Sequence, residues 1–391
     1  MAVLLLIVFV DLLGFGIVGS TFPYAMMHAG APDWLVVWGG PGVFSIFQMI
    51  AAPIWGRLSD AYGRKPIFIA SLSGAVVIYI WLANADSAVS LLAARALGGF
   101  MAGNLGAAFA YATDSSTPET RARTLGYMGM AFGAGFALGP VAGGVFAGNA
   151  IESFSLVGPA LTGAVTSLVA LAGSIFVLKE SLKVESRRPL SERHPGSRSP
   201  LLSGLKVPGL SLVLAAAWVM SAVGTMMQAA FPLWGTHYVG MSPKLTTWLL
   251  VLSAAGATIG QGVAVGTMTR YFGERRVAQL GAMFLATGLL ILWLLPHPFA
   301  IGGANFLVGF GLGIFQTCGA TLTTFFADPR QRGAILAGLQ NAQSLGRIVG
   351  PGVAAVVSAH LTHSAPFWAG AILIIPALVL IQRVRLPETV H

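Results

Sequence analysis

Residues 56–66, GRLSDAYGRKP, separate two long apolar runs, and a degenerate copy of this segment, GTMTRYFGERR, occupies residues 266–276. The two segments lie 210 positions apart, and Gly139–Pro140 is matched by Gly350–Pro351 at an offset of 211. A nearly constant offset between two pairs of segments indicates an internal duplication. Parallel repeats of six helices are a known construction of secondary transporters, in which the substrate binds near the middle of the membrane.

The composition places the chain in a lipid bilayer. Hydrophobic residues make up 55% of its 391 positions and charged residues only 9%, whereas soluble domains carry about 25% charged residues. A spanning helix needs roughly 20 apolar residues. Long apolar runs occupy residues 2–27, 36–55, 67–84, 88–112, 124–147, 155–178, 208–236, 245–268, 277–295, 299–324, 333–359 and 364–382. The runs do not alternate in polarity, which excludes a β-barrel. We therefore expect an all-α integral membrane protein with twelve transmembrane helices in two six-helix pseudo-repeats.

Charged residues indicate the topology. Residues 179–207 combine Pro, Ser, Gly and charge, a composition that cannot bury enough apolar area to fold alone. They predict a cytoplasmic linker between an N-terminal six-helix bundle, residues 1–178, and a C-terminal one, residues 208–391. Lys and Arg gather in the loops after the even-numbered runs, and Lys244 is the exception in the odd loops. The positive-inside rule then places both termini in the cytoplasm of a multi-pass protein, which we expect in a bacterial inner membrane.

Several classes of protein are excluded. The net charge of +9 follows the topology and is not gathered in one basic patch, so we expect no nucleic-acid partner. One cysteine, Cys318, and the lack of a His/Cys cluster argue against a metal site. The sequence contains no phosphate-binding Gly-x-x-x-x-Gly-Lys-Ser/Thr loop, and its histidines lie in loops, at helix ends or at a terminus. We expect no cofactor and no enzymatic activity.

Residues 56–66 resemble the loop 2–3 signature of the major facilitator superfamily, and the resemblance extends over essentially the whole chain. The matching positions are Gly56, Asp60, Gly63, Arg64 and Lys65. Ala61 departs from the signature, which usually has an arginine there. The resemblance implies the major facilitator fold and a conformational latch around Asp60, which can interact with a helix N-terminus or a nearby cation. A solvated loop charge is the alternative interpretation.

Residues 135–144, GFALGPVAGG, are similar to the antiporter signature of proton-coupled drug exporters in that superfamily. Its matching positions are Gly135, Gly139, Pro140, Gly143 and Gly144. Independently of the resemblance, glycines that recur every four residues on one helix face let a neighbouring backbone approach closely, and a proline favours a kink. A tight structural crossing without any antiporter role therefore remains an alternative.

The first and fourth apolar runs resemble those of the tetracycline/proton antiporters and their drug-exporting relatives. The first carries Asp11-Leu-Leu-Gly-Phe-Gly, and the fourth carries Arg95 followed by Gly98–Gly99, with Asp114 near its end. Ser20 stands where those relatives usually have a proline. Asp114 is expected to cap a helix or to pair with Arg121 or Arg123.

Asp11 and Arg95 are the candidate proton-coupling residues. A charged side chain in the middle of a membrane helix costs about 2.5–3.5 kcal/mol on insertion scales, so it is expected to face the interior and to find a partner. Counting 1.5 Å per residue, Asp11 lies about 15 Å from one membrane face and Arg95 about 10 Å from the other. We expect the two to lie at one level as a proton-coupling pair, with a static buried ion pair as the alternative.

Polar or aromatic side chains in otherwise apolar runs are the substrate-binding candidates. They are Gln48, Asn104, Gln228, Trp234, Gln261, Asn305, Gln316, Gln340, Asn341 and Arg347. A buried amide can equally serve as contact between helices. Arg347 has no obvious carboxylate partner in a C-terminal helix, so it binds either an anionic substrate group or backbone carbonyls near Gly350–Pro351.

These patterns predict a proton-coupled secondary transporter that exports amphipathic small molecules, of the multidrug or tetracycline type, by alternating access. Its expected partners are a small-molecule substrate, protons and the lipid bilayer, and we expect a monomer. The alternatives are an exporter or facilitator of one endogenous metabolite, and a non-transporting sensor with a transporter fold.

Overall fold

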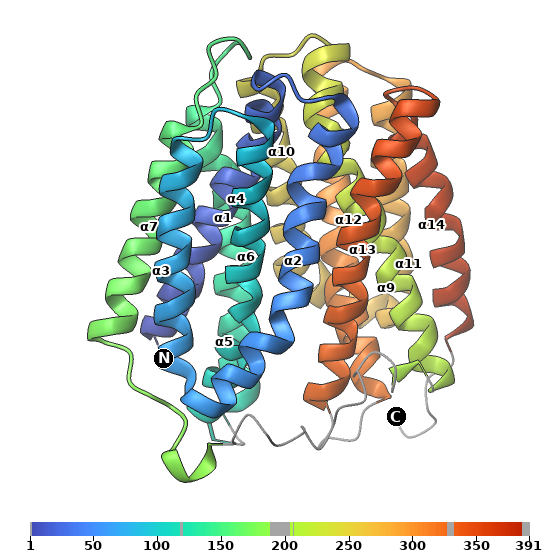
Figure 1. Cartoon of the computed structure of the whole chain (residues 1–391). Coiled ribbons are helices and arrows are strands. Elements are labelled where there is room, and N and C mark those ends of the chain that lie inside the picture. The colour runs from blue at the N-terminus through green and yellow to red at the C-terminus, as the bar shows by residue number, and fades with distance from the viewer. Residues whose placement is uncertain (1, 118–119, 188–203, 206, 327–331, 385–391) are drawn as a thin grey trace. The chain divides into compact units, whose positions relative to one another are not determined.

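The computed structural model describes residues 2–117, 120–187, 204–205, 207–326 and 332–384 (Figure 1). Within these residues the regular structure is helical. Most of the predicted linker, residues 188–203 and 206, lies outside the described residues. The chain divides into two compact units, of which the first is Met1–His194 with Ser242–Trp248 and the second is Pro195–Met241 with Leu249–His391.

The first unit is built from membrane-length helices and their connections. They are α1 (Ala2–His28), α2 (Asp33–Tyr62), α3 (Arg64–Ala83), α4 (Ala88–Met101), the 3-10 turn η1 (Ala102–Asn104), α5 (Leu105–Asp114), α6 (Arg121–Phe146), α7 (Val157–Phe176) and the 3-10 turn η2 (Val184–Ser186). The predicted fourth run is thus a helix interrupted by η1. Ser87 caps α4, because its Oγ accepts a hydrogen bond from the N–H of Ser90.

The second repeat follows the same plan. Its elements are α9 (Pro208–Leu233), the π-helical turn η3 (Trp234–Tyr238), α10 (Pro243–Ile259), the π-helical turn η4 (Gly260–Ala264), α11 (Val265–Leu294), α12 (Pro298–Phe325), α13 (Arg332–His360) and α14 (Ala365–Arg383). Proline starts α9, α10, α12 and stands near the start of α14. This is a favourable place for proline, because the first N–H groups of a helix have no partner within it.

Two glycines turn the chain sharply at equivalent places in the two repeats. Gly63 has φ 107° and Gly273 has φ 73°. Residues with a Cβ atom rarely adopt such positive φ angles. The predicted loop at residues 56–66 therefore reduces to the single residue Gly63 between α2 and α3. Gly273 likewise breaks α11 into two helical parts. The duplicated segments thus end one helix and start the next, rather than forming loops.

The repeats also share their pattern of helix neighbours. Helix α1 packs against α6 and α7, as α9 packs against α13 and α14, and α3 packs against α7 as α11 does against α14. Each unit has its own apolar core, which includes Leu4, Ile7 and Leu72 in the first and Leu285 and Phe315 in the second. The internal duplication predicted from the sequence is therefore present in the packing.

The helices have the length and composition to cross a membrane. Among the described residues, nine helical stretches meet both conditions, and one of them, Pro243–Leu294, contains the turn at Gly273 and covers two of the predicted runs. Helices α6 and α13 add two further stretches of 26 and 29 residues. The twelve-helix integral membrane fold is thus confirmed. Large apolar side chains such as Val165, Leu168 and Ile372 are exposed, as expected of helix faces that contact lipid.

Candidate functional site

Asp11 lies in the interior of α1, nine residues after its first residue. Its side chain is half-buried, and no hydrogen bond or ion pair joins it to another described residue. The other acidic residues of the described α-helices lie at or near a helix end or beside the Gly273 turn: Asp33, Asp60, Asp114 and Glu274. Asp11 is therefore the carboxylate placed deepest in a described helix.

The helix that carries Asp11 packs directly against the glycine motif of α6. A Cβ atom on Gly135 would lie 2.7 Å from the Cβ of Leu12, and one on Gly139 would lie 2.5 Å from the Cα of Gly16. A Cβ on Gly143 would lie 3.0 Å from the carbonyl oxygen of Ile17. Three glycines spaced four residues apart thus allow α1 and α6 to touch backbone to backbone.

The remaining two residues of that motif have other surroundings. Helix α6 continues through Pro140 without a break, although proline supplies no N–H to the helix. Gly144 is buried, and its nearest side chains do not belong to α1. The predicted tight crossing is thus present, and the antiporter role of the motif stays a prediction.

Arg95, on α4, is enclosed by aromatic rings rather than by a carboxylate. Its side chain is 5% exposed, and its guanidinium carbon lies 5.4, 5.1 and 4.8 Å from the ring centroids of Phe15, Phe22 and Phe44. A guanidinium within about 6 Å of an aromatic ring is stabilised by the negative face of the ring. Its Nε has no hydrogen-bond partner among the described residues.

The expected direct contact between Asp11 and Arg95 is not observed in the described part of the chain. Phe15 and Phe22 follow Asp11 by about one and three turns of α1, so Arg95 lies farther along that helix than Asp11. The hydroxyl of Tyr79, on α3, lies within range of the charges of both residues. Its hydroxyl would lie 3.4 Å from a Cβ atom on Gly14, one turn from Asp11. Tyr79 was missed in the sequence because an aromatic residue in an apolar run is not distinctive.

A charge cluster joins three helices of the first unit. The Arg64 guanidinium pairs with Asp60 through Nη1 at 2.5 Å and with Asp114 through Nε at 3.0 Å. Nη1 also donates to Ser59 Oγ at 3.0 Å. Asp60 is therefore paired rather than a free loop charge. Asp114 was expected to pair with Arg121 or Arg123, but its partner here is Arg64, and the side chains of those two arginines lie outside the described set.

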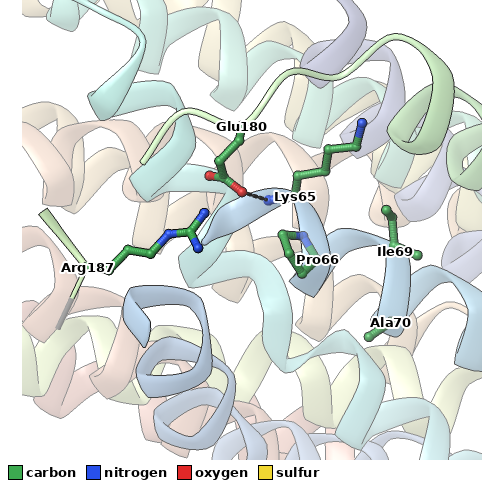
Figure 2. A pocket seen from close by; sticks show the side chains of 6 residues that line it. All are labelled: Lys65, Pro66, Ile69, Ala70, Glu180 and Arg187. Atoms are coloured by element: carbon green, nitrogen blue, oxygen red, sulfur yellow. Dashed lines mark hydrogen bonds between the residues drawn. The ribbon is translucent and has the colours of Figure 1, made fainter. Parts of the chain in front are cut away.

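Glu180 completes this charge cluster from the start of the predicted linker. Its Oε1 accepts a hydrogen bond from the backbone N–H of Arg64 at 2.9 Å. Its Oε2 accepts one from the backbone N–H of Lys65 at 3.1 Å (Figure 2). A carboxylate at this place satisfies free N–H groups at the start of α3 and faces the positive end of the helix dipole. A Cβ atom on Gly63 would collide with the same carboxylate.

The residues beside Glu180 are tied to the cluster as well. Ser181 donates to Asp114 Oδ2 at 3.3 Å, and the carbonyl of Lys179 accepts from the hydroxyl of Tyr111 at 2.9 Å. Lys65 donates through Nζ to the carbonyl of Ile175 at 2.8 Å. A groove of about 500 Å³ lies beside these contacts, lined by Lys65, Pro66, Ile69, Ala70, Glu180 and Arg187 (Figure 2). The first residues of the predicted linker thus belong to the folded first unit.

Several substrate-binding candidates make contacts within their own unit. Asn104 is buried and donates to Ser71 Oγ at 2.5 Å, and Gln48 donates to the carbonyl of Ala102 at 3.3 Å. Gln261 donates to Gln316 at 3.2 Å. These contacts connect neighbouring helices, which is the alternative role expected of such amides.

The other candidates divide into buried and exposed residues. Trp234 is 5% exposed and packs against Phe231 and Phe367 in the core of the second unit, so its surroundings are those of a core residue. Asn305 is fully buried and donates to the carbonyl of Ile301. Exposed or half-buried polar side chains remain at Gln228, Gln340, Asn341 and Arg347.

Comparisons with known proteins agree with this architecture. The family model described as Major Facilitator Superfamily matches residues 4–238 and 213–390. The chain is 28% identical over 370 residues to the class C tetracycline resistance protein of Escherichia coli, covering 94% of this chain and 91% of that protein. It is 27% identical over 382 residues to multidrug resistance protein 2 of Bacillus subtilis, covering 95% and 92%.

Solved structures share the fold. The crystal structure of the human organic anion transporter MFSD10 aligns with a TM-score of 0.70 and 22% identity, covering 97% of this chain and 98% of that one. A bacterial homologue of the human lysosomal transporter Spinster aligns with a TM-score of 0.71 and 16% identity, covering 98% and 93%. The chain is therefore a membrane transporter rather than an enzyme, and it belongs to the Major Facilitator Superfamily.

Proposed function

We propose that this transporter exports amphipathic small molecules in exchange for protons. The observation that carries the proposal is the placement of Asp11. It is a carboxylate in the interior of α1, without a hydrogen bond or ion pair to a described residue, on a helix packed against the glycine motif of α6. Intramembrane carboxylates commonly relay protons in transporters. An unpaired carboxylate can bind and release a proton without breaking a structural ion pair.

The relatives support export of drug-like molecules. Proteins named for tetracycline resistance and multidrug resistance match more than nine-tenths of the chain. In this proposal the charge cluster around Arg64 stabilises one conformation of the cytoplasmic side, and alternating access breaks and re-forms it. Arg95 acts on Asp11 through its charge, without direct contact, and Tyr79 lies near both residues. The protein acts as a monomer in a bacterial inner membrane with both termini in the cytoplasm, an orientation supported by the basic residues of the even loops.

Transport in proteoliposomes tests the proposal. Vesicles with an acidic lumen should accumulate radiolabelled tetracycline or ethidium, because protons that leave the lumen drive substrate inward. Nigericin, which collapses the pH gradient, should abolish accumulation and leave counterflow exchange intact. Counterflow without any effect of the gradient would instead indicate a facilitator. If neither gradient-driven accumulation nor counterflow exchange is observed with any drug or metabolite tested, the protein is a non-transporting sensor.

A further inference from the structure

Arg347 is a cation deep in the second repeat that the proposed proton coupling does not use. It lies 15 residues after the first residue of α13 and 13 before the last, which at 1.5 Å per residue is about 22 and 20 Å from the two ends. Its side chain is half-buried. A guanidinium at this depth is unfavourable in hydrocarbon and requires compensation by an anion or by dipoles.

The described surroundings supply little compensation. Nη2 of Arg347 donates to Ser344 Oγ at 2.6 Å, and no ion pair links the guanidinium to a described residue. A neutral hydroxyl accepts one of the five N–H groups of a guanidinium and leaves its charge unbalanced. Helices α9, α10, α12, α13 and α14 contain no acidic residue. Helix α11 carries Glu274, which forms no ion pair with Arg347. The described helices of this unit therefore offer Arg347 no paired carboxylate, and an anion from outside them can supply the missing charge.

The rotation of α13 places Arg347 beside a helix contact rather than within it. Gly346 is the contact residue, because a Cβ atom there would lie 2.6 Å from the carbonyl oxygen of Trp218 on α9. Gln340, Ser344 and Arg347 follow one another at intervals of four and three residues, so they share a neighbouring face of α13. Gln340 is exposed. An amide, a hydroxyl and a guanidinium in a row favour a face that contacts water rather than lipid.

The internal duplication argues against a purely architectural role for Arg347. At the offset of 211 that relates Gly139–Pro140 to Gly350–Pro351, the first repeat has Phe136. The helix pairs α1–α6 and α9–α13 share two close-contact glycines, because Gly346 and Gly350 stand at the positions of Gly135 and Gly139. The shared packing therefore does not require an arginine at this position, and the charge is specific to the second repeat.

We propose that Arg347, with Gln340 on the same face, binds the carboxylate of an amphipathic organic acid. The inference rests on the proposed transport function and names a substrate class for it. The planar fork of a guanidinium matches the two oxygens of a carboxylate and can donate to both. The position near the middle of α13 excludes a lipid phosphate, because phosphates lie at the surface of a hydrocarbon layer about 30 Å thick.

Equilibrium binding tests the site without a proton gradient. Purified full-length protein in phosphatidylcholine nanodiscs is dialysed at pH 7.5 against benzoate, naphthalene-2-carboxylate and pyrene-1-carboxylate, each compared with its carboxamide. Wild type should bind at least one acid about 10- to 100-fold more tightly than its amide, the range expected of a hydrogen bond to a charged group. Arg347→Gln should remove that preference. Arg347→Lys should retain part of it, because the charge stays and the fork is lost.

Arg383→Gln is the matched control, since it removes an exposed arginine at the end of α14 and should leave the preference unchanged. Wild type without an acid preference in all three pairs would overturn the assignment, as would a full preference in Arg347→Gln. If Arg347→Gln is not monodisperse, an unchanged acid affinity in Arg347→Lys would overturn it. Proton-driven transport is measured separately, so failure here leaves the proposed antiport standing.

Discussion

The contact between α1 and α6 predicts a large difference between two chemically identical substitutions on one helix. In Gly139→Ala the new Cβ would lie 2.5 Å from the Cα of Gly16, 2.7 Å from its carbonyl carbon and 3.1 Å from the nitrogen of Ile17. Favourable contacts between carbon atoms lie at about 3.5–4.0 Å. All three neighbours are backbone atoms, so the helices would have to separate by about 1 Å. Gly133→Ala is the control, because no atom lies within 4 Å of a Cβ at that position.

The difference between these variants isolates the collision. Both gain the same helix propensity, up to about 1 kcal/mol, and only Gly139→Ala adds a methyl group to a filled interface, which costs about 1–3 kcal/mol. At about 2–4 °C per kcal/mol for a unit of this size, the Tm of Gly139→Ala should lie about 2–12 °C below that of Gly133→Ala. The Tm of each variant is measured by heating the protein in detergent and quantifying the remaining monodisperse fraction by size-exclusion chromatography. An equal or higher Tm for Gly139→Ala would refute the close approach of α1 and α6.

Three further substitutions test the charged groups of the first unit. Glu180→Gln removes the negative charge at the start of α3 and should lower the free energy of unfolding by about 1 kcal/mol, whereas a Tm equal to that of the exposed control Glu185→Gln would contradict the capping role. Asp60→Asn removes one of two carboxylates on Arg64 and should shift the protein towards the inward-open state, and unchanged spin-label distances on the cytoplasmic side would count against a latch. Arg95→Lys keeps the charge but loses planar contact with three rings, so we expect a loss of about 1 kcal/mol, and a wild-type Tm would show that the rings do not hold the guanidinium.

The sequence was sufficient to predict the membrane helices and the internal duplication. Long apolar runs specify membrane helices almost regardless of context, because every backbone polar group in lipid must be satisfied within the segment. Gly63 and Gly273 were identifiable as equivalent residues from their offset of 210. The positive φ angles of these two glycines could not be predicted, and the expected loops are single-residue turns between helices.

The partners of the charged residues could not be predicted in the same way. Counting residues along a helix gives the depth of Arg95 but not the direction in which its side chain points. Asp11 was therefore the expected partner of the guanidinium, whereas the structure places three phenylalanine rings around it. Glu180 was assigned to the linker because local composition there is polar. Its role depends on a contact with Arg64, 116 positions away in the chain, which no local pattern reveals.

The most direct test of proton-coupled transport is substrate accumulation by Asp11→Asn in proteoliposomes with an acidic lumen. Asp86→Asn, which changes an exposed carboxylate outside the helices, is the control. The account predicts that wild type and Asp86→Asn accumulate substrate under the pH gradient, whereas Asp11→Asn performs counterflow exchange and does not respond to the gradient. Accumulation by Asp11→Asn that matches wild type, and that nigericin abolishes, would contradict the proposal that Asp11 couples transport to protons.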